Sequence, residues 1–208
     1  MADLLDDVLR ESHRSLAERL ETSSVALRGD AKCGEIRQRT DAFLIEMCRH
    51  VSAVCDVILP AVREQVPNGG QRVRAYVEQV KRFERSAART KGRLYGASRD
   101  VQVPWERVWV ELGTEFDRML AVEADLIAEA VAVCSADDNV RLASRLRATR
   151  LTGPTRPHPH SPHTGRLAHV VRRIWILADA AWDSAEARTV PGAVRAAKHP
   201  PKAAITKV

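Results

Sequence analysis

Residues 43–62, FLIEMCRHVSAVCDVILPAV, decide the fold. Phe43 and Met47 precede His50 by seven and three residues, and Val54 follows it by four. In an α-helix this spacing places all four side chains on one stripe. The segment therefore predicts a buried helix that carries a histidine among its apolar residues.

The same helical period extends over most of the chain. On the first predicted helix, Leu9 and Leu16 place His13 on the apolar stripe, as their equivalents do for His50. Long helices joined by short connections predict an all-α fold, an antiparallel up-down four-helix bundle with additional C-terminal helices. The predicted helices are 2–27, 32–65, 71–95 and 104–134, followed by the shorter 137–148 and 166–187.

The composition changes sharply after residue 150. The next fifteen residues, LTGPTRPHPHSPHTG, contain four prolines and three histidines and predict an extended Pro/His-rich strap over the surface. The expected organisation is a helix bundle over 1–150, the strap over 151–165, a docked amphipathic helix over 166–187 and a basic, disordered tail over 188–208.

The helix at 166–187 carries two tryptophans, Trp175 and Trp182, seven residues apart. This spacing suits either docking on the bundle or lying at a membrane surface. Docking is the expected arrangement, because the helix also carries acidic residues such as Asp179.

The net charge of +6 is concentrated in two segments. Residues 72–99 contain nine Lys and Arg against two Glu, and residues 188–208 contain five Lys and Arg and no acid. The remainder is acidic, so the overall charge does not mark the whole chain as a nucleic-acid-binding protein. Weak contacts with nucleic acid or an anionic surface are expected at these two segments.

The four cysteines form no C-x-x-C pair, and the acidic opening MADLLDDVLR is not a secretory signal. Both features predict reduced thiols in a cytoplasmic protein. No apolar run approaches the length of a membrane span. The chain has no G-x-S-x-G and no phosphate-binding glycine loop, so nothing in it argues for an enzyme.

Three residues predict a polar site inside the bundle: His13, His50 and Glu123. Glu123 lies among Met119 and Leu126 on an otherwise apolar stripe, where a carboxylate needs a cationic partner or a proton. His13 or His50 could be that partner. Each histidine alone is best explained as a hydrogen-bonded core residue. Together with Glu123 they favour a shared polar site, with metal binding as the alternative.

The strap offers a secondary metal candidate at the surface. His158, His160 and His163 follow an H-x-H-x-x-H spacing that can chelate a metal in an extended chain. The simpler interpretation is that these residues pack the strap over the bundle, because His/Pro tracts are weak compositional signals.

Several strings resemble the hemerythrin-like (HHE) domain family in the diverged form common in actinobacterial proteins. The strings are SHRSLAERL around His13, RHVSAVCDVILPAV around His50, RTKGRLYG at 89–96, WERVWVEL with EFDRML and EADLI within 105–127, and the tract TRPHPHSPHTG. The resemblance implies an up-down four-helix bundle that holds a non-heme di-iron centre, used for oxygen binding, for sensing oxygen or nitric oxide, or for iron handling.

The resemblance also implies which positions would hold iron. His13 and His50 match family histidines, and Glu123 matches a family carboxylate. Three further ligand positions are occupied by Val54, Val80 and Met119. Valine cannot coordinate iron, and methionine is a poor ligand for a hard, oxygen-bridged pair.

The sequence therefore predicts a hemerythrin-like protein with a degenerate di-iron site and no cofactor, which acts as a non-catalytic binding or regulatory module for an unidentified protein partner. One alternative is a working non-heme iron protein that uses His13, His50 and Glu123. The other is a basic nucleic-acid-associated protein.

Overall fold

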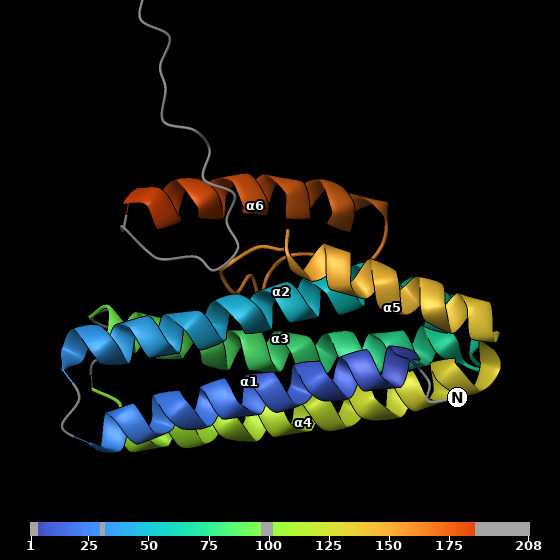
Figure 1. Ribbon diagram of the computed structural model, residues 1–208. Coiled ribbons are helices and arrows are strands. Elements are labelled where there is room, and N and C mark those ends of the chain that lie inside the picture. Colours follow the sequence, from blue (N-terminus) through green and yellow to red (C-terminus); the bar gives the residue numbers. More distant parts are fainter. Residues whose placement is uncertain (1–3, 30–31, 97–101, 186–208) are drawn as a thin grey trace, which may run out of the picture.

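The computed structural model describes residues 4–29, 32–96 and 102–185, and within these ranges the chain is all-helical, as predicted (Figure 1). No strand occurs in the described residues. The six helices are α1 (Leu4–Arg28), α2 (Cys33–Gln65), α3 (Gly69–Leu94), α4 (Trp105–Val133), α5 (Ala136–Arg150) and α6 (Arg166–Ala185).

The four longest helices, α1 to α4, lie side by side, and each runs opposite to the one before it (Figure 1). α2 contacts α1, α3, α4 and α5. The core between them contains aromatic contacts: the ring centroid of Phe116 lies 5.6 Å from that of Phe43, in an edge-on contact, and 6.4 Å from that of Phe83, in a tilted one. These residues fall on the apolar stripes that the 3.6-residue period predicted, which is why the helices bury these faces.

α2 is buried on nearly all sides over residues 43–62, not along one stripe alone. Its apolar stripe faces α1, α3 and α4, and its opposite side is covered by α5 and the strap. Gly153 at the start of the strap lies directly on α2, where an added Cβ would come within 2.9 Å of the Cα of Arg49. A helix covered on both sides needs apolar residues all round, which explains the composition of this segment.

The connection between α2 and α3 is very short. α3 begins at Gly69, two residues before its predicted start, and Asn68 at its N-cap adopts a left-handed conformation with φ 56°. A Cβ at position 69 would lie 2.9 Å from the Cα of Arg63, so only glycine allows the two helices to approach this closely.

α6 lies outside the other helices, with the strap beneath it (Figure 1). Residues 151–165 form turns and bends without a helix or strand. None of the helices in the described ranges combines the length and the apolar character that crossing a membrane requires. The tail predicted over 188–208 lies outside the described residues.

Candidate functional site

The structure brings His13, His50 and Glu123 together between α1, α2 and α4. The Nε2 atoms of His13 and His50 lie 2.8 and 2.7 Å from the same oxygen, Oε1 of Glu123. His50 and Glu123 are fully buried, whereas the side chain of His13 is 17% exposed. Both histidines that the sequence suggested as partners of Glu123 lie within hydrogen-bonding distance of it.

Tyr76 on α3 completes the group. Its hydroxyl donates to the other carboxylate oxygen, Oε2 of Glu123, at 2.6 Å. Each of the helices α1 to α4 therefore contributes one side chain: His13, His50, Tyr76 and Glu123. We call these four residues the Glu123 cluster.

The hydrogen bonds fix where the protons lie. An ionised carboxylate only accepts, so Nε2 of each histidine must carry a proton and donate it to Oε1. The other ring nitrogen of His50, Nδ1, lies 2.9 Å from the hydroxyl of Ser12, which supplies a partner on the far side of the ring. Both ring nitrogens of His50 and both carboxylate oxygens of Glu123 therefore have partners inside the protein, as buried polar groups require.

The electrostatics of Glu123 are a balance between burial and its histidine partners. Burial alone would raise its pKa, but the charge of His50 and the hydrogen bonds from both histidines outweigh it. The net result holds the pKa of Glu123 well below its ordinary value, so the group is a carboxylate at neutral pH.

The hydroxyl of Tyr76 is held in its protonated form. Burial, with the nearby charge of Glu123, raises the pKa of Tyr76 well above its ordinary value. Tyr76 therefore acts as a hydrogen-bond donor and not as a phenolate at neutral pH.

The residues present do not fit a di-iron centre. Val54, Val80 and Met119, which stand at three positions where the family resemblance implies ligands, are fully buried in the apolar core. They offer no nitrogen or oxygen to a metal. In the described part of the chain, one group of three or more His, Cys, Asp or Glu ligands converges: His13, His50 and Glu123, with ligand atoms within 4.8 Å of one another. This set could hold at most one ion.

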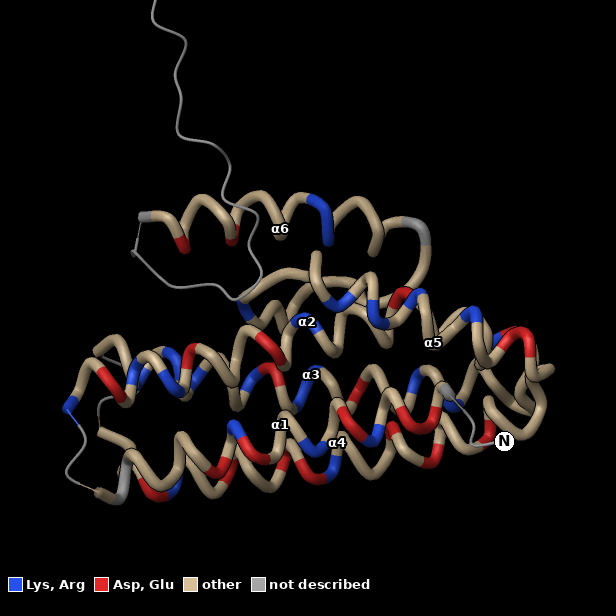
Figure 2. Tube along the Cα trace, viewed as in Figure 1, with Lys and Arg blue, Asp and Glu red and all other residues tan. Residues whose placement is uncertain are grey.

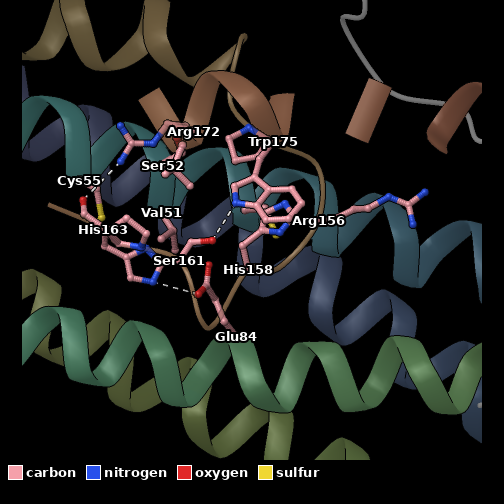
Figure 3. A pocket seen from close by; sticks show the side chains of 14 residues that line it. Val51, Ser52, Cys55, Glu84, Arg156, His158, Ser161, His163, Arg172 and Trp175 are labelled. Carbon is pink, nitrogen blue, oxygen red and sulfur yellow. Dashed lines mark hydrogen bonds and ion pairs between the residues drawn. The ribbon is translucent and has the colours of Figure 1, made fainter. Parts of the chain in front are cut away.

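Two of the strap histidines, His158 and His163, take separate partners (Figure 3). His158 stacks on Trp175, with ring centroids 4.1 Å apart, and pairs with Asp179 of α6. His163 is buried and its Nε2 lies 3.0 Å from a carboxylate oxygen of Glu84 on α3. His160 is exposed.

Within the described residues these three histidines belong to no group of three or more ligands. The cavity between the strap and α2 measures about 30 Å³, room for about one water molecule.

The basic residues of α3 are partly neutralised by α4. Arg89 donates to both carboxylate oxygens of Glu111, and Arg72 pairs with Glu129. The guanidinium of Arg93 lies over the ring of Trp105. These pairs account for part of the positive charge that the sequence places over 72–99.

Tyr76 and Ser12 were not among the site residues predicted from the sequence. Tyr76 lies on the buried stripe of α3, one turn before Val80, and a tyrosine on such a stripe needs a partner for its hydroxyl. This need could have indicated from the sequence that Tyr76 belongs to a buried polar site. Ser12 precedes His13 by one residue, and its link to His50 depends on how α1 and α2 pack, which the sequence does not reveal.

Comparisons with known proteins returned nothing. No family model matches the chain, and no curated protein or solved structure matches it.

Proposed function

We propose that this protein is a hemerythrin-like up-down four-helix bundle in which the Glu123 cluster stands where the family resemblance places a metal centre, and that it acts as a non-catalytic binding or regulatory module. The proposal is supported by the strings around His13 and His50 and by the position of both histidines on the first two long helices.

One observation supports the proposal that the metal site is degenerate. Both oxygens of Glu123 accept from protein donors: two histidines on Oε1 and Tyr76 on Oε2. A metal would have to displace both Nε2 protons and break both histidine bonds, because the lone pairs that coordinate a metal are the ones that carry these protons. The buried Val54 and Val80 supply no compensating ligands.

The competing function is that of a non-heme iron protein in which His13, His50 and Glu123 hold a single iron. The convergence of their three ligand atoms favours it, because two histidines and one carboxylate form a known iron-binding set. A bound iron would supply the capacity to bind oxygen or nitric oxide.

Iron analysis of anaerobically purified protein separates the two functions. We expect much less than one iron per chain and no change in melting temperature on adding ferrous ion. A ferrous concentration about a hundredfold above Kd would instead add about 2.7 kcal/mol of stability. In a chain of this size that is a rise of about 5–10 °C.

The matched control removes the exposed strap histidine, His160→Ala. If His160→Ala abolishes iron uptake, the iron was bound at the surface, and the proposal stands. Stoichiometric iron with a raised melting temperature, both lost in His50→Leu and kept in His160→Ala, would establish the competing function.

A further inference from the structure

α6 turns its polar side toward the rest of the molecule. Asp179 and Asp183 are buried, and both are held by the strap. The backbone N–H of Thr155 donates to Asp179 at 2.8 Å, and the guanidinium of Arg156 donates to Asp183 at 3.0 Å. In Figure 2 the acidic positions of α6 lie on its side toward the bundle.

Two further contacts fix this orientation. The indole N–H of Trp175 donates to the hydroxyl of Ser161 at 2.8 Å (Figure 3), and Arg172 pairs with Asp56 on α2. The helix therefore contacts the strap and α2 through polar groups. Trp175 takes part in docking, whereas Trp182 is 61% exposed.

Several large apolar side chains of α6 point outward. Leu177 is 73% exposed and Leu167 65%. Leu167, Val170, Ile174 and Leu177 follow one another at helical spacing, and Trp182 is exposed five residues further on. We call these five exposed residues the α6 stripe. A continuous apolar stripe on an outer surface marks a site of interaction.

The charges next to the α6 stripe are cationic. Among the described side chains of α6, both carboxylates are buried, and Arg173 is exposed beside Ile174. The sequence that follows the helix, residues 186–208, contains five Lys and Arg and one acid, Glu186, a net charge of +4. The described surface is thus an apolar stripe with an exposed arginine beside it and with the two described carboxylates of α6 buried, and the sequence beyond the helix carries a net positive charge.

We propose that the α6 stripe docks on an anionic lipid bilayer surface, with α6 lying in the plane of the headgroups. An interfacial helix needs an apolar face to enter the headgroup boundary and basic residues to meet anionic lipid. Basic residues beside such a helix strengthen its attraction to the negative surface potential. The strap contacts present α6 in this orientation before it meets the membrane.

A second copy of the chain fits the stripe less well. A symmetric pairing places the same patch on both partners. Arg173, beside Ile174 near the middle of the stripe, would then lie close to Arg173 of the other copy, with no exposed acid among the described side chains of α6 to offset the repulsion. An anionic bilayer meets the same arginine with opposite charge.

Vesicle flotation of the full chain tests the proposal. We expect binding to phosphatidylcholine vesicles that contain phosphatidylserine, and at least about tenfold weaker binding to vesicles of phosphatidylcholine alone. The double variant Ile174→Gln/Leu177→Gln should lose at least about tenfold in binding to the anionic vesicles. Its helix content should match the parent, because both side chains are exposed.

The matched control is Val110→Gln/Val140→Gln, which removes two exposed apolar side chains from α4 and α5. It should bind like the parent chain. No binding of the parent to anionic vesicles, or equal loss in both double variants, would overturn the proposal. So would a dimer seen by sedimentation that the Ile174→Gln/Leu177→Gln variant abolishes in the absence of vesicle binding.

Discussion

Replacing Glu123 by leucine is expected to lower the free energy of unfolding by about 3–5 kcal/mol. The change removes the one acceptor shared by His13, His50 and Tyr76 and leaves their donors facing an apolar side chain. A buried donor without a partner costs about 1–3 kcal/mol, and His13, being partly exposed, can recover part of its loss through water. Urea denaturation measures the change.

Glu123→Gln is the matched control. Glutamine keeps the shape, and its carbonyl oxygen can still accept from both histidines, so the loss should be about half that of leucine or less. A loss below about 1 kcal/mol for Glu123→Leu, or equal losses for leucine and glutamine, would show that the three donors do not depend on this carboxylate.

The contacts in the structure indicate that losing Glu123 lowers the free energy of unfolding more than losing either histidine. Burial alone suggests that removing a histidine is worse, since it orphans a buried carboxylate. In the structure the carboxylate has three donors, so His13→Leu or His50→Leu leaves it with two. We therefore expect both histidine variants to be less damaging than Glu123→Leu.

Acid is expected to destabilise the protein through the same group. The pKa of Glu123 is lowered in the folded state, whereas an unfolded chain has a glutamate pKa of about 4.3. The unfolded state therefore takes up its proton first as the pH falls. The stabilisation from ionised Glu123 is complete above about pH 4.3 and declines below it, by about 1.4 kcal/mol for each pH unit between the two pKa values.

The carboxyl carbon-13 chemical shift of Glu123, followed from neutral pH downward, checks this directly. It should remain that of a carboxylate through about pH 4.3 until the protein unfolds. A titration at or above that pH would mean that burial outweighs the two histidines and that the pKa of Glu123 is not lowered by folding.

The helices were predictable because their burial follows a local pattern. The apolar period predicted all six, and the ends in the structure differ from the predicted ones by a few residues. The pairing of Glu123 with the two histidines was predictable from the residue types on the apolar stripes. A buried acid and two histidines on apolar stripes need one another, and the structure pairs them.

What the sequence could not predict depends on contacts between distant segments. Whether the hydroxyl of Tyr76 reaches Glu123 depends on the rotation of α3 relative to α4. The orientation of α6 could not be predicted either, because the apolar residues of an amphipathic helix normally face a core. The core beneath it is already closed by the strap and α5, and the strap offers donors to Asp179 and Asp183, so the polar side of α6 faces inward.

Nitrogen-15 NMR of the histidine rings, with and without equimolar zinc as a diamagnetic probe of the metal site, tests the state of the Glu123 cluster. We infer that protons, and not a metal, occupy the Nε2 positions of His13 and His50. We expect protonated, hydrogen-bonded Nε2 signals for both rings that stay unchanged when zinc is added. Loss of both Nε2 protons on adding zinc, with shifts typical of metal-bound imidazole, would contradict this inference and identify a working metal site.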